Sequence, residues 1–135
     1  MIVVDTSVAV AAAFRMHAAH RRVQAALPAR PTRLLGPVAV ETYSVLTRMP
    51  TPGRLAPSVA RAYLREKFEL PPLVLDGTGV DELLEAAAQT GIPGGAIYDA
   101  IVAATASAAG AALLTLDHRA ARTYDLVGAT YELLE

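Results

Sequence analysis

The sequence contains no cysteine and no tryptophan, and only one of its twelve basic residues, Lys67, is a lysine. The absence of cysteine excludes a disulfide framework, a cysteine-based zinc site, an iron–sulfur cluster and a thiol nucleophile. It also fits a reducing compartment. The longest apolar-leaning run, residues 100–114, is interrupted by hydroxyl side chains and a glycine, so we expect a buried helix and a strand there rather than a membrane span.

The N-terminal run MIVVDTSVAVAAAF lacks the basic segment of a signal peptide and carries Asp5 where such a peptide is apolar. We therefore expect a cytoplasmic protein with no membrane segment. With 135 residues, 53% hydrophobic and 19% charged, the chain has the size and composition of one folded domain spanning residues 1–135. Its net charge of −1 combines +7 in residues 1–67 with −8 in residues 68–135, and the basic half is a weak indication of an anionic partner.

Short apolar runs alternate with helical stretches along the chain. We expect strands at residues 2–4, 34–35, 73–75, 112–116 and 127–133, and helices at residues 8–14, 17–27, 37–49, 57–68, 79–90, 96–109 and 117–124. This alternation predicts an α/β fold, a three-layer α/β/α arrangement with a mainly parallel sheet of about five strands. Functional groups in such sheets gather at the carboxyl ends of the strands.

Four acidic residues fall where that edge should be. Asp5 and Asp117 directly follow predicted strands, whereas Glu41 and Asp99 lie about one turn inside predicted helices that begin at the same edge. Two unit charges about 5 Å apart repel by roughly 3 kcal/mol at an effective dielectric constant of about 20. Convergence of these carboxylates therefore requires raised pKa values or a bound cation.

All-oxygen ligation suits Mg²⁺ or Mn²⁺ rather than zinc. The hydroxyls of Thr6, Ser7 and Thr115 can orient the acidic ligands. A purely structural interpretation stays open at this point, because Asp5 and Asp117 can each be a helix N-cap and Glu41 can be a solvated helix residue.

Four stretches resemble a known family: Val3–Ser7 (VVDTS), Glu41–Arg48 (ETYSVLTR), Tyr98–Ala106 (YDAIVAATA) and Leu113–Asp117 (LLTLD). They are similar to the PIN domain and, more narrowly, to the VapC toxins of bacterial toxin–antitoxin pairs. The resemblance extends from residue 2 to about residue 133, and the stretch from residue 97 to residue 117 is its most specific part.

The resemblance implies a metal-dependent endoribonuclease that cuts structured or loop RNA (tRNA, rRNA or mRNA) and is neutralised by a VapB-type antitoxin. It also implies a homodimer. Asp5, Glu41, Asp99 and Asp117 match the family's acidic positions, and Thr6 and Thr115 match its supporting hydroxyls. Many members carry another acidic or amide residue shortly after the fourth acid. Here Arg119 and Ala120 follow His118, so a second metal position lacks that ligand.

Other functions fit the residues less well. A response-regulator receiver needs a lysine at a later strand end, and a haloacid-dehalogenase-type phosphatase needs an aspartate where Ser7 stands. A catalytically silent PIN-like module that binds RNA or protein remains the alternative. His17 and His20, three residues apart, can share a metal, face RNA or be ordinary surface residues, and Tyr98 is expected to pack against the fold.

Overall fold

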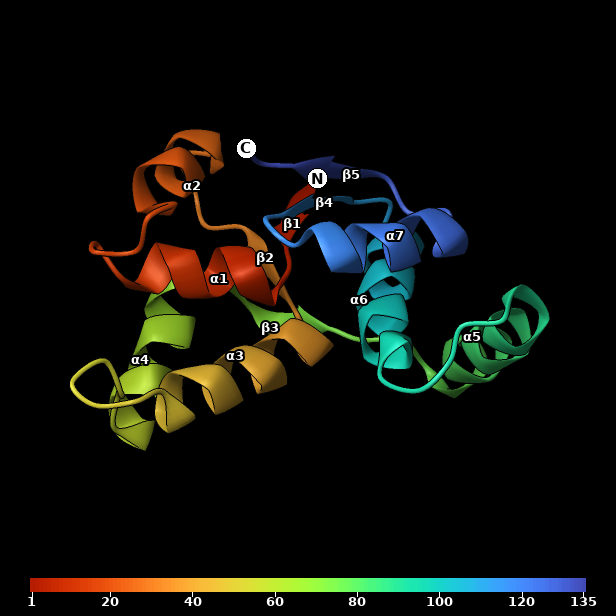
Figure 1. Ribbon diagram of the computed structural model, residues 1–135, viewed down its shortest axis with the longest axis horizontal. Coiled ribbons are helices and arrows are strands. Elements are labelled where there is room, and N and C mark those ends of the chain that lie inside the picture. Colours follow the sequence, from red (N-terminus) through yellow and green to blue (C-terminus); the bar gives the residue numbers. More distant parts are fainter.

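A computed structural model describes residues 1–135, and its five strands are all parallel (Figure 1). The elements follow one another in the order β1 (Ile2–Val4), α1 (Thr6–Ala13), α2 (His20–Ala26), β2 (Arg33–Leu35), α3 (Gly36–Arg48), α4 (Pro57–Lys67), β3 (Glu69–Leu73), α5 (Gly77–Thr90), α6 (Ala96–Ala108), β4 (Ala112–Thr115), α7 (His118–Val127) and β5 (Tyr131–Leu133). The predicted α/β class is thereby confirmed.

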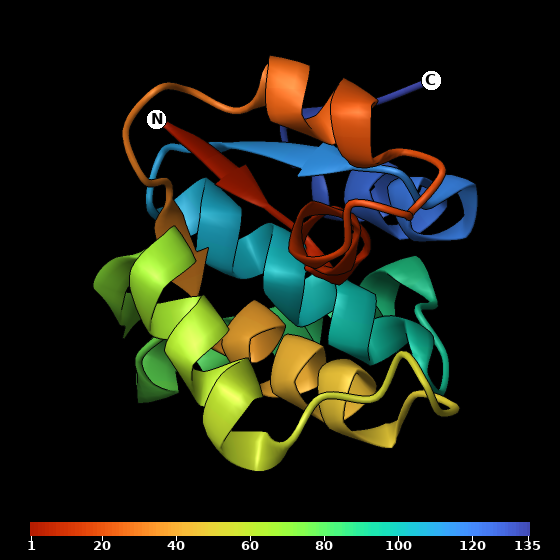
Figure 2. The same cartoon turned by 90° about the vertical axis from the view of Figure 1, so that its left-hand side faces the viewer.

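Hydrogen bonding divides the strands into two groups. One sheet has the order β1-β4-β5, and β2 pairs with β3 in a second. Strands β1 and β2 contact each other without forming a ladder, so the two groups lie side by side. Figure 2 shows α2 on one side of β1 and β4 and α6 on the other, which is the expected α/β/α layering.

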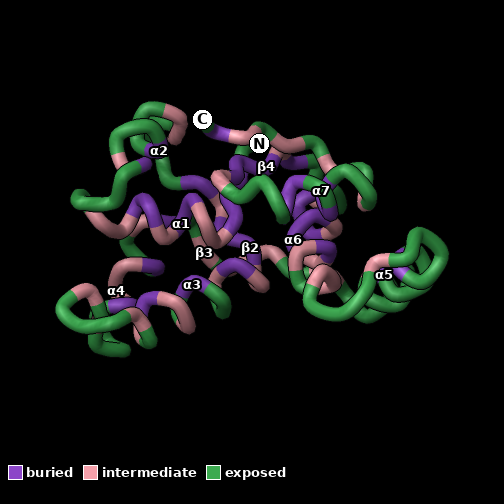
Figure 3. Tube along the Cα trace, viewed as in Figure 1, coloured by how far each residue is buried: buried purple, intermediate pink, exposed green.

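The core forms around the central strand β4. Val3 pairs with Leu113 and Val4 with Leu114, and each of these side chains is at most 2% exposed. Buried residues concentrate in β1, β4, α1, α6 and α7, whereas α5 is mostly exposed (Figure 3). Strands buried on both faces are continuously apolar, which explains why the sequence located β1 and β4 correctly.

Strand β3 lies upstream of its predicted position. We expected a strand at residues 73–75, but β3 covers Glu69–Leu73 and includes Pro71 and Pro72. Proline cannot donate to a ladder and usually argues against a strand. Here β3 pairs with β2 alone and so has one free edge, where a missing N–H is tolerated.

The start of α3 fixes how Glu41 is presented. Pro37 occupies the first turn, where its missing N–H costs nothing. A Cβ on Gly36 would lie 2.5 Å from Cγ1 of Val74, so only glycine allows α3 to begin this close to the chain that follows β3. No helix combines the length and the apolar character needed to cross a membrane.

Candidate active site

The four predicted acids line one pocket of about 330 Å³. Asp5 follows β1, Glu41 lies in α3, Asp99 lies in the first turn of α6, and Asp117 follows β4. Thr6 and Ser7 also line the pocket, and most of its other residues are apolar. The parallel sheet therefore brings together side chains that are up to 112 positions apart in the sequence.

Asp5 is only 3% exposed and is held by donors on both carboxylate oxygens. Its Oδ1 accepts from the Ser7 hydroxyl (2.5 Å) and from the N–H of Val8 (3.2 Å), and its Oδ2 accepts from the Tyr124 hydroxyl (2.9 Å). The Val8 bond makes Asp5 the N-cap of α1. The cap interpretation is thus correct for Asp5, but a cap alone needs neither the Ser7 nor the Tyr124 hydroxyl.

The Ser7 hydroxyl makes a second bond, and the Thr115 hydroxyl lies close to the same network. Ser7 Oγ accepts from the N–H of Leu116 (2.9 Å), and Thr115 Oγ1 accepts from the N–H of Asp117 (3.0 Å). The Ser7 bond joins the residues after β1 to those after β4, whereas the Thr115 bond is local to the end of β4. Thr6 Oγ1 is different, because it is buried beside the pocket and has no hydrogen-bond partner. An unpartnered buried hydroxyl is costly, and a ligand in the pocket is one means of satisfying it.

Asp117 and Asp99 present their carboxylates in different ways. Asp117 is exposed and caps α7, its Oδ1 accepting from the N–H groups of Arg119 (2.9 Å) and Ala120 (3.2 Å). Asp99 is half-buried, and no hydrogen bond holds its carboxylate in place. Glu41 is exposed on α3. The pocket thus combines two fixed carboxylates with two freer ones.

The pKa values of Asp5 and Asp99 are both raised in this pocket. Burial raises the pKa of Asp5 above its ordinary value, and hydrogen bonds, chiefly from Ser7, Thr115 and Tyr124, oppose the rise. Burial also raises the pKa of Asp99, and the negative charges of the other three pocket acids raise it further. Arg119 lowers the pKa of Asp99 only partly. The other three carboxylates are therefore close enough to repel that of Asp99.

The donor set fits a hard divalent cation in its chemistry, but the side chains do not form a closed shell. Four carboxylates and an unpartnered hydroxyl offer only oxygen, which suits Mg²⁺ or Mn²⁺. As they stand, however, no group of three or more His, Cys, Asp or Glu side chains is arranged to hold a metal. Oδ1 of Asp5 and Oδ1 of Asp117 already accept hydrogen bonds from backbone N–H groups, as the N-caps of α1 and α7.

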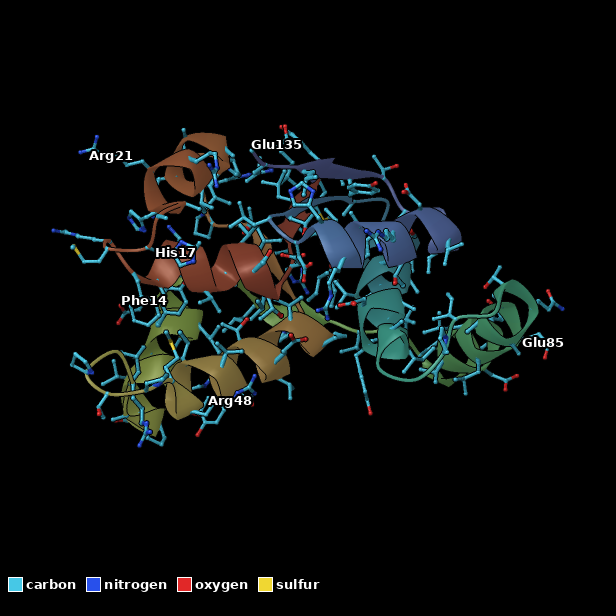
Figure 4. The ribbon with its side chains drawn as sticks, viewed as in Figure 1. Phe14, His17, Arg21, Arg48, Glu85 and Glu135 are labelled. Atoms are coloured by element: carbon cyan, nitrogen blue, oxygen red, sulfur yellow. The ribbon has the colours of Figure 1, made fainter.

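Sequence reasoning missed Tyr124 and left three interpretations of His17 open, and both residues line the pocket. Tyr124 is 1% exposed, and burial together with Asp5 raises its pKa well above the ordinary value, so its hydroxyl remains a donor. The four-residue spacing of Ala120 and Tyr124 places both on one face of α7, a pattern visible in the sequence. His17 lies in the loop between α1 and α2 (Figure 4), and no sequence pattern connects it to the acids.

Other predicted residues lie outside this pocket. His20 does not line it and holds α2 against α1 through a bond between its Nδ1 and the carbonyl oxygen of Ala11 (2.9 Å). The expectation that Tyr98 packs against the fold is wrong, because Tyr98 is 70% exposed. It lies instead in a larger groove of about 1110 Å³ between α3, α6 and the segment after β3, and Glu41 and Asp99 line both hollows.

Comparison with known proteins agrees with this architecture. The family model of the PIN domain matches residues 2–126. The chain belongs to the PIN-domain family, whose nucleases are generally metal-dependent.

Its relatives are named ribonucleases. Ribonuclease VapC40, from two strains of Mycobacterium tuberculosis, is 45% identical over 134 residues, which cover 99% of each chain. Ribonuclease VapC27 from Mycobacterium tuberculosis is 45% identical over 127 residues, 94% of this chain and 92% of the relative. The likeness to VapC ribonucleases therefore extends over nearly the whole chain.

Proposed function

We propose that this protein is a VapC-type toxin, an endoribonuclease that hydrolyses structured or loop RNA. The observation that carries the proposal is the convergence of Asp5, Glu41, Asp99 and Asp117 on one pocket. The near-full-length similarity to ribonucleases VapC40 and VapC27 supports it independently.

The acids have separate tasks in this proposal. Asp5, Glu41, Asp99 and Asp117 are the residues that would hold Mg²⁺ or Mn²⁺, and such an ion supplies a water of lowered pKa and a counter-charge for a phosphoryl oxygen. Asp5 provides a fixed oxygen because Ser7 and Tyr124 hold its carboxylate. Asp99 is repelled by the other three acids, whose charges, together with burial, raise its pKa.

The hydroxyls keep the acids in position. Ser7 donates to Asp5 while accepting from the backbone after β4, so it sets the distance between the two strand ends. Thr115 lowers the pKa of Asp5 and accepts from the N–H of Asp117. Thr6 contributes a buried hydroxyl without a protein partner. Residues that orient ligands in this way typically affect metal affinity by about 10- to 100-fold.

The proposed partners are RNA, a VapB-type antitoxin and a second copy of the chain, all in the cytoplasm. Exposed arginines on α2 and α4 support an anionic partner: Arg21, Arg22, Arg61 and Arg65. Exposed Val40, Val74 and Tyr98 around the larger groove support a protein partner, because exposed apolar patches mark interaction surfaces.

One observation favours a second candidate, a catalytically silent PIN-like module that binds RNA or protein. The pocket side chains, as they stand, form no group of three that could hold a metal. In a silent module, Asp5 and Asp117 would serve only as the N-caps of α1 and α7.

Incubation of the purified protein with total bacterial RNA separates the two candidates. Parallel reactions contain Mg²⁺, Mn²⁺ or a chelator, and each is repeated with Asp99→Asn and with Asp81→Asn, a matched change of an exposed aspartate on α5. Discrete fragments that require metal, vanish with Asp99→Asn and persist with Asp81→Asn establish the ribonuclease. RNA binding without cleavage under every condition would favour the silent module.

A further inference from the structure

The acidic pocket needs a donor for its substrate as well as ligands for a cation. RNA is a polyanion, and the pocket lining carries four carboxylates but no arginine or lysine. The hydroxyls of Ser7 and Tyr124 already donate to Asp5, which leaves the buried Thr6 hydroxyl as the one uncommitted hydroxyl donor in the lining. His17 is the one basic side chain in the lining, and it is exposed to solvent.

The pocket extends along one face of α1 toward His17. Thr6 and Val10, four residues apart, lie on the same face of this helix, and both line the pocket. His17 follows the end of α1 and continues that lining beyond Val10. The histidine therefore lies toward the opposite end of the pocket from Asp5, where Figure 4 shows it beside the last turns of α1.

Local hydrogen bonds hold His17 in place. Its backbone N–H donates to the carbonyl oxygen of Phe14 (3.1 Å), and its carbonyl oxygen accepts from the N–H of His20 (3.0 Å). Its ring Nδ1 accepts from the N–H of Ala19 (3.0 Å). A histidine whose Nδ1 is an acceptor carries its proton on Nε2 when neutral, so the ring offers an N–H donor at Nε2.

We infer that His17 is a substrate-binding residue, whose Nε2–H donates to a phosphate oxygen of a nucleotide flanking the bond that the carboxylates act on. This inference rests on the proposed function and specifies how the same site engages the RNA strand. A hydrogen bond from a fixed donor to a charged oxygen is stronger than a neutral one. It also opposes the repulsion between the RNA and the four acids.

Two substitutions at position 17 separate the Nε2 donor from the loop geometry. The asparagine introduced by His17→Asn can still accept from the N–H two residues later, as in an Asx turn, but its side chain does not reach the Nε2 position. His17→Gln places an amide N–H near Nε2 and restores a donor. His20→Asn is the matched control, because His20 does not line the pocket.

The experiment measures binding of a short fluorescein-labelled single-stranded RNA of random sequence by fluorescence anisotropy. All proteins carry Asp99→Asn so that the RNA stays intact, and Mg²⁺ affinity is measured by calorimetry for each position-17 variant with Asp99 intact. We expect His17→Asn to weaken RNA binding about tenfold and His17→Gln to recover most of that loss. The RNA affinity of His20→Asn should stay within about twofold of the parent's. The Mg²⁺ affinity of the position-17 variants should also stay within about twofold of that of the unmodified protein.

Equal RNA binding by the parent and His17→Asn would overturn the inference, as would an equal loss with His20→Asn or no RNA binding by the parent. Unchanged binding with His17→Asn, while the protein with Asp99 intact still cleaves total RNA, refutes this inference and leaves the proposed function standing. Absence of cleavage by the unmodified protein, with the position-17 effect on binding intact, refutes the nuclease and keeps the RNA contact.

Discussion

Two hollows share Glu41 and Asp99 yet differ in almost every other respect. The smaller, about 330 Å³, has four carboxylates and a bonded network of hydroxyls. The larger, about 1110 Å³, has Arg48 as its cation and the exposed side chains of Val40 and Tyr98. The smaller hollow brings four carboxylates together, whereas the larger one exposes apolar side chains at its edge.

The difference separates chemistry from recognition. Burial and then repulsion from the other three acids raise the pKa of Asp99, and groups perturbed in this way cluster at functional sites. Apart from Glu41 and Asp99, which line both hollows, the larger groove has no acidic side chain, and its Arg48 donates to the hydroxyl of Ser44 (2.7 Å). Changes in the two hollows should therefore have different consequences, and four experiments test this.

The largest effect is expected from Asp5→Asn. The amide keeps the size of the carboxylate but removes its charge and turns one acceptor into a donor that faces the Tyr124 hydroxyl. RNA cleavage should fall by about 10²- to 10³-fold, the loss typical of removing a group that stabilises transition-state charge. Rates on total RNA measure it. Asp125→Asn, an exposed aspartate on α7, should change the rate less than about twofold, and equal losses would contradict the assignment.

Tyr124→Phe should have the next largest effect. It removes only the hydroxyl that donates to Oδ2 of Asp5, so the carboxylate loses one of its fixed positions. We expect Mg²⁺ affinity, measured by calorimetry, to fall about tenfold. Tyr131→Phe is the control, because that ring packs edge-on against Tyr124 while its hydroxyl bonds to Asp125 instead. A loss of stability in Tyr124→Phe with unchanged Mg²⁺ affinity would show that the hydroxyl only supports the fold.

A smaller effect, of opposite sign, is expected on stability. In the absence of divalent metal, Asp99→Asn removes a repelled charge and should raise the free energy of unfolding by about 1 kcal/mol after screening by solvent, or Tm by roughly 3–5 °C. Because the folded pKa of Asp99 is raised, the destabilisation is fully present above that pKa and is lost as pH falls through it toward 3.8. Thermal melts from neutral to acidic pH should therefore show the advantage of Asp99→Asn shrinking. A constant advantage would exclude the charge as its cause.

The smallest effect is expected from Val40→Ser in the larger groove. Val40 is 73% exposed, so the substitution should leave both Tm and the cleavage rate of the free chain nearly unchanged. Light scattering of the same samples reports whether self-association is altered. A cleavage loss comparable to that of Asp5→Asn would show that the larger groove also takes part in cleavage.

Sequence reasoning located most of the fold because its evidence was local. The apolar runs of β1 and β4 and the carboxylates that follow them are contiguous in the sequence, so their shared edge could be deduced from parallel topology. The placement of β3 could not, because its prolines conceal a strand that only its edge position permits. The larger groove was equally hidden, since the exposure of Tyr98 depends on what α3 and the segment after β3 leave uncovered.

The missed residue Tyr124 and the unpredicted position of His17 beside the acids show the same limit. Tyr124 reaches Asp5 across 119 positions, and His17 faces the pocket through a loop whose hydrogen bonds are all local. Neither residue is adjacent in the sequence to one of the four pocket acids. Helix packing, which the hydrophobic pattern alone does not determine, decides which side chain of α7 or of the α1–α2 loop faces the carboxylates.

The bond between Asp5 and Tyr124 also sets an order of events during synthesis. Asp5 is synthesised near the start of the chain. Its carboxylate lacks the Tyr124 hydroxyl, and Ser7 lacks the N–H of Leu116, until the last elements have been synthesised. A chain interrupted before β4 and α7 therefore carries Asp5, Glu41 and Asp99 but lacks Asp117 and Tyr124. Under the proposed function, the pocket is therefore complete only once nearly the whole chain has been synthesised.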